Sequence, residues 1–372
     1  MARHLATIQR ISEIADIEGK DRIGLATVLG WKVIVQKSDY KVGDLCIYVE
    51  PDSLLPEKPE FEFLRSKNFR IKVMKMAGVV SYGICFPISI LPPNISVEEG
   101  LDVTEILNIT KYEAPTDDGL RETRKPKQPR NPVVKYMMKY GWFRSIYNRI
   151  NTKNKKDGFP SFISKTDEER IQNIPDMLNV DCLWTGTEKI DGQSGTFFLK
   201  RTTKGILKRK TLEFGVCSRN LRLPKPKEID ATSSYWFVAQ KYNIEQVLME
   251  ILNTIGKEWE WVAIQGECIA PKVQGNKYKV TEPDLYVFNF VTPDGKWSSL
   301  SGKALLEKYG LKWVPILYTD FTMPNTVDEL LNIADGESVL LEGQMREGIV
   351  WRNSEKNLSF KSVSPKFLLK YD

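Results

Sequence analysis

The sequence predicts an α+β protein in which a small N-terminal β-barrel precedes a larger domain of mixed helices and strands. Residues 1–110 contain short β-rich runs separated by turns. Residues 111–158 are rich in basic residues and prolines. From Phe159 onward, helix-like segments alternate with strand-like runs. A chain of 372 residues is also long for one domain, so its length favours more than one.

Five short runs of β-branched, aromatic and aliphatic residues define the expected barrel. Turn residues separate them, including Gly30, Lys41–Asp44 and Ala77–Gly78. Strands at this spacing are typical of a small barrel, and an OB-like fold fits the length. Such barrels often bind nucleic acid, but a purely structural barrel would show the same pattern. The runs are Leu25–Leu29, Trp31–Val35, Leu45–Val49, Ile71–Met74 and Ile84–Phe86.

Residues 111–158 combine positive charge with aromatic residues, and Val133–Ile150 has a helical pattern. A basic face that carries tyrosine and tryptophan could follow a phosphate backbone and stack on bases. A solvated linker, with a helix that docks its apolar side, is the alternative. Lys153, Lys155 and Lys156 extend the positive run and are the candidate nucleic-acid-binding residues.

Helices are also expected in the C-terminal part. Thr166 and Glu169 have the spacing of a capping box, which predicts a helix over Asp167–Gln172. Two further helices are expected at Trp236–Leu252 and Ser301–Tyr309.

Composition excludes several classes of site. The single histidine, His4, leaves no Ser-His-Asp triad or histidine metal cluster. The five cysteines are scattered without a C-x-x-C spacing, so neither a disulfide framework nor a cysteine zinc site is expected. No apolar run approaches the roughly 18 residues of a membrane span, and the N-terminus lacks a signal-peptide profile. A cytoplasmic protein is therefore expected, in the host cytosol if the source is viral. The formal charge of +6 points only weakly to a polyanionic partner.

The central chemical signal is Thr187-Glu188-Lys189-Ile190-Asp191-Gly192. A lysine amine can attack the α-phosphorus of a nucleotide and form a phosphoramidate whose bond energy is passed on. Because its ordinary pKa is about 10.4, such a lysine needs nearby cations that favour the neutral amine. The K-x-D-G spacing also arises by chance, so the downstream segments matter.

An ordered series of candidate site segments follows Lys189. Each alone could be a surface charge or a core residue, but together they favour one nucleotide pocket. They are Ser218–Asn220, Gln265–Cys268, Tyr286–Phe290, Glu347–Arg352 and Ser359–Lys361.

This order resembles the covalent nucleotidyltransferase superfamily of polynucleotide ligases and capping enzymes. Most narrowly, the chain resembles ATP-dependent RNA ligases with an N-terminal OB-like module and a C-terminal adenylyltransferase domain of ATP-grasp-like ligase fold. The resemblance covers nearly the whole chain, and it implies a module at residues 1–110, a basic linker and helix at 111–158 and a catalytic domain at 159–372. Further segments that carry it are Val42–Asp44, Glu50–Ser53, Phe159–Phe162, Thr166–Asn173 and Gly266–Tyr278.

The resemblance also implies residue roles. Lys189 would be the nucleophile, and Glu188 would read the adenine amino edge. Phe288 would stack on the purine, while Arg219 and Glu267 would hold the ribose. Arg170 would reach the triphosphate, and Lys361 would contact the α-phosphate. The residues implied around a magnesium or manganese ion are Asp191, Glu267 and Glu347.

The implied reaction seals a 5′-phosphate to an RNA 3′-hydroxyl, through lysyl-AMP and an AMP-capped strand. The implied partner is RNA, as a nicked duplex or as free ends, bound by a monomer. A capping-type guanylyltransferase, a DNA ligase and a non-catalytic OB-fold nucleic-acid-binding protein remain alternatives. Two departures from the family pattern are Val363, where many RNA ligases have a second lysine, and Ser194, where some have asparagine. Lys366 or Lys370 could replace the missing lysine.

Overall fold

The computed structural model describes residues 4–112, 158–204 and 209–371, which form two compact units. The first unit is built from Met1–Pro115, Asp167–Ile190 and Val314–Asp372, and the second from Thr116–Thr166 and Asp191–Trp313. The chain thus passes from one unit to the other more than once, whereas the expected domains are consecutive. The expected boundaries at residues 110 and 158 stay a prediction. The basic linker and helix, with Lys153, Lys155 and Lys156, lie mostly at 113–157, outside the described residues.

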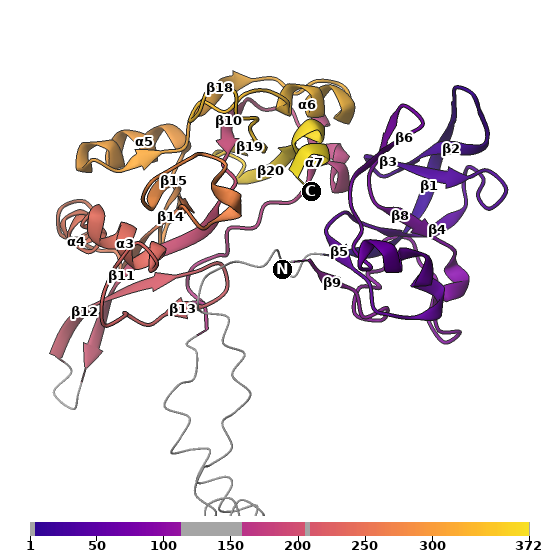
Figure 1. Cartoon of the computed structure of the whole chain (residues 1–372). Coiled ribbons are helices and arrows are strands. Elements are labelled where there is room, and N and C mark those ends of the chain that lie inside the picture. Colours follow the sequence, from indigo (N-terminus) through magenta and orange to yellow (C-terminus); the bar gives the residue numbers. More distant parts are fainter. Residues whose placement is uncertain (1–3, 113–157, 205–208, 372) are drawn as a thin grey trace, which may run out of the picture. The chain divides into compact units, whose positions relative to one another are not determined.

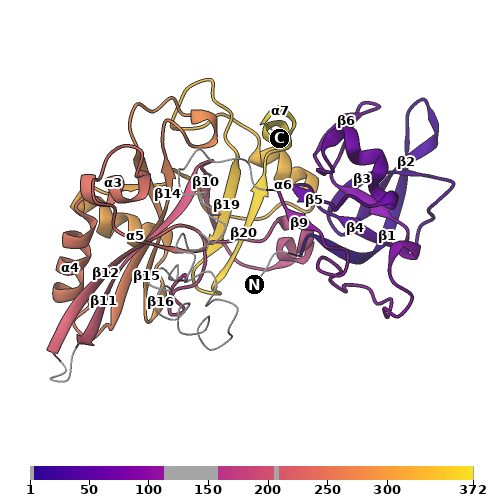
Figure 2. The same cartoon turned by 60° about the horizontal axis from the view of Figure 1, so that its bottom comes forward.

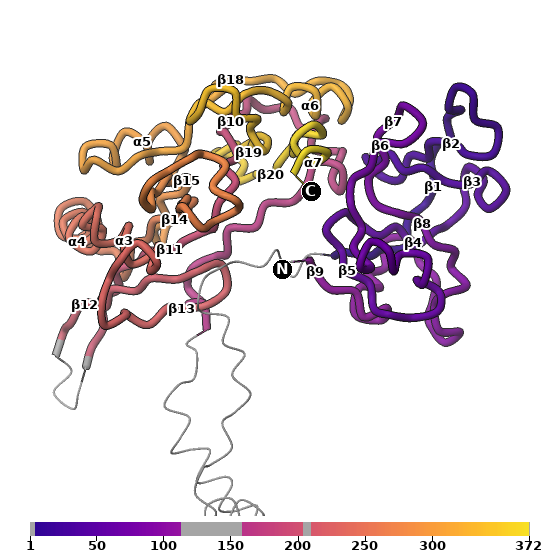
Figure 3. Tube along the Cα trace, in the orientation of Figure 1, coloured from indigo at the N-terminus to yellow at the C-terminus, as the bar shows by residue number. Residues whose placement is uncertain are grey.

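The N-terminal part of the first unit is an antiparallel sheet in the order β3-β2-β1-β4-β8. Its path can be followed as the indigo-to-purple tube in Figure 3. Tyr82 donates its backbone N–H to the Lys32 carbonyl (2.8 Å), so the segment before β8 returns to β3 and curls the sheet toward closure. The expected OB-like architecture is present. The sheet strands are β1 (Ala6–Ile17), β2 (Lys20–Val28), β3 (Trp31–Gln36), β4 (Leu45–Val49) and β8 (Ile84–Phe86).

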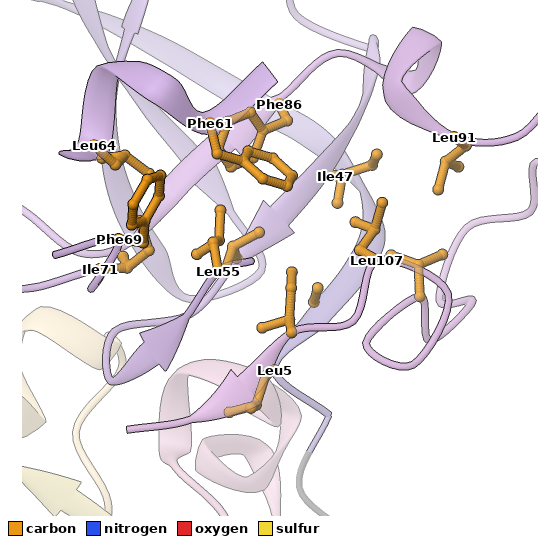
Figure 4. Close-up of a cluster of buried hydrophobic side chains, with 14 of the residues drawn as sticks. Leu5, Ile47, Leu55, Phe61, Leu64, Phe69, Ile71, Phe86, Leu91 and Leu107 are labelled. Atoms are coloured by element: carbon orange, nitrogen blue, oxygen red, sulfur yellow. The ribbon is translucent and has the colours of Figure 1, made fainter. Parts of the chain in front are cut away.

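Apolar side chains cover both faces of this sheet. Residues along each strand alternate between the two faces, so one strand contributes to two cores. Trp31 and Tyr48 lie in the core on one face. Figure 4 shows the other core, where Leu55, Phe61 and Leu107 belong to one cluster. The remaining elements of this region are β5 (Ser53–Leu54), η1 (Pro59–Lys67), β6 (Met74–Met76), β7 (Val79–Ser81), η2 (Ile88–Ile90) and β9 (Thr110–Lys111).

The first unit also contains a second sheet in the order β18-β10-β19-β20, here called the β10 sheet. Helix α6 packs on it through Leu330 and Leu331, which share a core with Trp351. A capping box at Thr326 and Glu329 begins that helix. The elements are η3 (Ile171–Asn173), η4 (Pro175–Asn179), β10 (Trp184–Lys189), β18 (Ile316–Phe321), α6 (Val327–Ala334), β19 (Gly348–Asn353), β20 (Leu358–Val363) and α7 (Pro365–Tyr371).

The second unit is a mostly antiparallel sheet in the order β13-β12-β11-β14-β15-β16, with β17 parallel to β15. Helices α3 and α4 lie beside β11 and β12 in Figures 1 and 2. The strands are β11 (Gln193–Lys204), β12 (Arg209–Cys217), β13 (Arg222–Leu223), β14 (Trp261–Ile269), β15 (Asp284–Thr292), β16 (Gly295–Lys296) and β17 (Lys312–Trp313). The helices are α3 (Ser234–Lys241), α4 (Ile244–Thr254), η5 (Gln274–Asn276), α5 (Ser299–Leu306) and η6 (Glu307–Tyr309).

Several expected elements differ from those observed. The long strand β1 was not expected, and the strand expected at Ile71–Met74 is wrong except at its last residue. The helix expected at Asp167–Gln172 is also wrong, because only a 3₁₀ turn forms at Ile171–Asn173. The helix expected at Trp236–Leu252 is broken by Asn243, whose φ is 46°. Within the described ranges, none of the helices has the length and apolar character needed to cross a membrane.

Candidate active site

Strand β10 ends at Lys189, which pairs in the β10 sheet with Gly348, the first residue of β19. Glu347 immediately precedes that strand. Its Oε2 lies 2.5 Å from the Lys189 Nζ, and both side chains are largely shielded from solvent. The strand pairing therefore brings together two residues that are 158 positions apart in the chain. The sequence predicted both residues for the site, and here they form an ion pair.

The two faces of the β10 sheet carry different side chains. Thr187 pairs with Val350, which pairs with Lys361, so these residues share the face of Lys189. The intervening residues point to the other face, where Trp184 and Trp351 lie in the core. Lys189 and Lys361 therefore project from the same side of one rigid sheet.

Glu188 belongs to the other face and is 1% exposed. Its Oε1 accepts a hydrogen bond from the Ser338 hydroxyl (2.5 Å), and its Oε2 accepts one from the Val339 N–H (2.9 Å). Burial raises the pKa of this carboxyl, although the Ser338 and Val339 donors and the Arg346 charge oppose the rise. Each carboxylate oxygen can accept two hydrogen bonds, so acceptor capacity remains. Its role in reading adenine stays a prediction, and the structure adds Ser338 as the group that orients it.

Arg170 lies next to Lys361. The two residues form an isolated parallel bridge, and the Lys361 N–H donates to the Glu169 carbonyl (2.8 Å). The Arg170 side chain is buried, with its Nη2 3.4 Å from an Asp52 oxygen. Its Nε and Nη1 have no hydrogen-bond partner among the described residues. When buried N–H groups of a cationic side chain lack an acceptor, they are expected to bind an anion or water.

The segment that carries Arg170 is attached to the N-terminal sheet. Asn173 donates to Glu50 (2.5 Å) and accepts from the Trp31 indole (2.6 Å). The Gly30 N–H donates to the Gln172 carbonyl (2.8 Å). A Cβ on Gly30 would lie 2.8 Å from the Gln172 Cα, so this close approach requires glycine. The Glu50–Ser53 motif thus serves to hold the Arg170 segment.

A polar network surrounds Arg352, a residue for which the sequence indicated no role. Its Nη1 donates to the Thr187 hydroxyl (2.9 Å), and its Nη2 lies 3.6 Å from Glu168. Glu168 also accepts a bond from the Ser359 hydroxyl (2.5 Å). Burial lowers the pKa of Arg352, and the Glu168 charge opposes that effect. Arg352 follows Glu347 by five positions, but nothing in that spacing indicated its contact with Thr187.

The second unit holds the remaining predicted residues. Asp191 pairs with the Lys277 Nζ (2.5 Å), and its backbone N–H donates to the Tyr278 hydroxyl (2.9 Å). The next residue, Gly192, leaves no room for a Cβ, which would lie 2.6 Å from the Cys268 carbonyl oxygen. The glycine of the K-x-D-G motif is thus required by packing.

Strands β12, β14 and β15 position Arg219, Glu267 and Phe288. Glu267 lies between Ser194 of β11 and Tyr286 of β15 in the sheet. Phe288 is the extra residue of a bulge, because the register shifts between Gln265 and Gly266. A bulge redirects a side chain, and Phe288 is only half-buried. Arg219 is the second residue after the end of β12.

The carboxylates implied as metal ligands offer oxygen donors, which suit magnesium or manganese. In the described parts of the chain, however, no group of three or more His, Cys, Asp or Glu side chains is gathered in metal-binding geometry. Glu347 and Asp191 each pair with a lysine instead. The donor chemistry of these carboxylates fits such an ion, and their role as its ligands stays a prediction.

Comparison with known proteins agrees with this arrangement. A sequence profile for an OB-fold domain matches residues 5–88, and one for RNA ligase matches residues 183–371. Naegleria gruberi RNA ligase with PPi is 28% identical, with a TM-score of 0.77 over 100% of this chain and 99% of that one. Two variants of that ligase, one with ATP and Mn and one with AMP and Mn, also match at 28% identity. Their TM-scores are 0.76, covering 98% and 99% of both chains respectively. No curated protein sequence matches the chain.

Proposed function

The chain belongs to the RNA ligase family, and on that premise we propose that it seals RNA 3′-hydroxyl and 5′-phosphate ends with ATP, through an AMP adduct on Lys189. The observation that carries this proposal is the position of Lys189 at the end of β10, within 2.5 Å of Glu347 at the start of β19. Solved structures of the similar Naegleria ligase that contain ATP or AMP with Mn support the choice of nucleotide.

In the first step, the Lys189 Nζ attacks the α-phosphorus of ATP. A phosphorus–nitrogen bond forms, the bond to the bridging oxygen breaks, and pyrophosphate leaves. The amine must be neutral to attack, and cations beside it favour that form.

The neighbouring cations would neutralise the charge of the phosphates. Nucleotidyl transfer depends mainly on positioning and on such charge stabilisation. Lys361 shares the face of Lys189 and would contact the α-phosphate. Arg170, beside Lys361, would direct its unpartnered Nε and Nη1 to the triphosphate, with Asp52 holding its Nη2.

The remaining nucleotide contacts are assigned by the family pattern. Phe288 would stack on the purine, Arg219 and Glu267 would hold the ribose, and Glu188 would accept from the adenine amino group. Asp191, Glu267 and Glu347 would hold a magnesium or manganese ion, which would supply further neutralisation of phosphate charge when bound.

Two transfers complete the cycle. The RNA 5′-phosphate attacks the lysyl-AMP phosphorus, so that a phosphoanhydride forms and the Lys189 amine is released. An RNA 3′-hydroxyl then attacks the capped 5′-phosphate and loses its proton, the phosphodiester forms and AMP leaves. We propose that the protein acts as a monomer in the cytoplasm. Its substrate would be a nicked duplex with an RNA 3′-hydroxyl, and the OB-fold module would help to hold that duplex.

The proposal is tested by mass spectrometry of the protein after incubation with ATP and magnesium. The expected result is an AMP mass on the peptide that contains Lys189, formed with ATP and not with GTP. A GMP adduct would instead indicate a capping-type guanylyltransferase. Absence of any adduct, with salt-sensitive RNA binding retained, would indicate a binding protein without ligase activity.

A second measurement addresses the nucleic acid. Sealing should be faster at an RNA 3′-hydroxyl nick than at a DNA 3′-hydroxyl nick of the same sequence, and the reverse order would indicate a DNA ligase. Alanine at Lys153, Lys155 and Lys156 together should weaken RNA affinity and leave adenylation unchanged. Because three phosphate contacts would be lost, the magnitude of the slope of log affinity against log salt should fall by about 2 to 3. Unchanged RNA affinity would remove the basic segment from the proposal.

A further inference from the structure

A pocket of about 380 Å³ opens on the second unit, between β12, the segment after β13, α3 and the start of α4. None of the residues assigned to the nucleotide lines it. Its volume exceeds that of one nucleobase and is within the ordinary range for small-ligand sites.

Aromatic rings form part of the wall. Phe214 on β12 and Trp236 on α3 meet edge-to-face, with ring centroids 6.0 Å apart. The Lys225 Nζ lies 5.8 Å from the centroid of the Trp236 ring. A cation close to an aromatic ring is a combination that proteins use to hold a nucleobase next to its phosphate.

The rest of the lining mixes polar side chains with the apolar Ile229, Ala239 and Met249, and it is nearly neutral in charge. Gln240, Asn243 and Gln246 provide amide donors and acceptors, which can match the edge of any base. Glu245 balances the charge of Lys225 among the lining residues, so the interior suits a neutral ring better than a phosphate. Lys227, which does not line the pocket, is exposed two residues beyond Lys225 and adds positive charge nearby.

We propose that this pocket binds one unpaired base of the RNA substrate, stacked on Trp236, with the adjoining phosphates near Lys225 and Lys227. This inference rests on the proposed function, because it takes RNA as the substrate. A base inside a duplex is covered by its neighbours, so only a base in a single-stranded or frayed segment can enter. Stacking tolerates any base, and the pocket would therefore contribute affinity without sequence specificity.

The test measures binding of the full chain to two fluorescent single-stranded 12-mers, an oligouridine and a strand with the same backbone but no bases. Wild-type protein should prefer the oligouridine by about tenfold, the effect of one stacked base. Trp236→Ala should abolish most of that preference, and Trp236→Phe should keep most of it. Lys225→Met should weaken binding of both strands, whereas Lys308→Met, at an exposed lysine outside the lining, should not.

Adenylation by labelled ATP is measured for every variant. Normal adenylation of Trp236→Ala with an undiminished preference for bases would overturn the pocket and leave the proposed function intact. If the wild-type protein is not adenylated by ATP, the proposed function itself is refuted.

If Trp236→Ala fails to fold, cross-linking on wild-type protein decides. RNA that carries 5-iodouridine should attach on irradiation to the peptides that contain Phe214 or Trp236. Attachment exclusively to other peptides would overturn the proposal.

Discussion

The two faces of the β10 sheet show how one set of strands can serve stability and chemistry at once. One face buries Trp184, Trp351 and Phe360 in a core that α6 covers. The other carries Lys189 and Lys361, with Arg352 bonded to Thr187 beside them. Successive residues of a strand point to opposite faces, so Glu188 and Lys189 have different surroundings although they are adjacent.

The difference between the faces indicates how the site obtains its rigidity. Large rings packed on the core face fix the positions of β10, β19 and β20 relative to one another. Lys189, Glu347 and Lys361 are then placed by strand register and not by flexible loops. Substitutions on the chemical face should therefore change rates with little change in stability, and substitutions that disturb the packed rings of the core face should do the reverse.

The largest expected effect on the chemical face is that of Lys189→Ala. Without the amine no phosphoramidate can form, so labelled ATP should leave no AMP on the protein. The melting temperature should stay close to that of wild type, because the side chain contributes nothing to the core. Lys308→Ala, at an exposed lysine, is the control and should be fully labelled. A normal AMP adduct in Lys189→Ala protein would show that the nucleophile lies elsewhere.

The second largest effect is expected from Glu347→Ala. Glu347 would help to hold the metal ion that neutralises phosphate charge, and removing one such stabilising contribution typically costs about 3 kcal/mol, so adenylation should slow by roughly 100-fold or more. Single-turnover labelling measures this rate. Glu355→Ala, at an exposed carboxylate of the turn between β19 and β20, should leave the rate unchanged. A rate within threefold of wild type for Glu347→Ala would exclude that carboxylate from the site.

Gly186→Ala tests the core face. A Cβ at this position would lie 2.7 Å from the Trp351 ring, and forcing extra volume into a packed core costs roughly 1–3 kcal/mol. Denaturant unfolding should show this loss, while adenylation per folded molecule stays close to normal. At Gly158 a Cβ would meet no atom within 4 Å, so Gly158→Ala is the matched control. A slow but fully stable Gly186→Ala enzyme would contradict the separation of the two faces.

Much of the fold could be predicted from the sequence, and the structure brings together Lys189 and Glu347 of the expected site. The Lys189 and Glu347 segments each carry a local pattern, and the fold, the family and the enzyme class that they indicated are confirmed. The prediction of a helix at Asp167–Gln172 was wrong because polar groups of this segment form hydrogen bonds with residues far away in the sequence. The Thr166 hydroxyl contacts Ser194, and the Gln172 carbonyl accepts from Gly30. A local capping pattern contains no information about such competing partners.

The contacts of Ser338 and Arg352 could not be predicted for the same reason. Ser338 is 150 positions from Glu188, and Arg352 is 165 positions from Thr187. Only the register of β10 with β19, and the loop that follows α6, bring these residues together. Strand β1 was not predicted because its apolar pattern is irregular. Charged residues such as Arg10, Glu13 and Asp16 occupy its exposed positions and interrupt that pattern.

The smallest expected effect concerns the pH dependence of stability at Glu188. Its folded-state pKa is raised by burial, so the folded protein holds the proton more tightly than the unfolded chain does. The contribution of Glu188 to the stability of wild type should therefore decline as pH rises above the ordinary value of 4.5, through the raised pKa. Glu188→Gln cannot ionise and keeps an oxygen for the Val339 N–H, so its stability relative to wild type should increase from pH 4 to pH 7. Thermal unfolding of both proteins across this range measures the difference, with Glu355→Gln as the exposed control. If the difference in stability between Glu188→Gln and wild type stays constant with pH, the Ser338 and Val339 donors fully compensate the burial of the Glu188 carboxylate. The two faces of the β10 sheet would then differ only in packing.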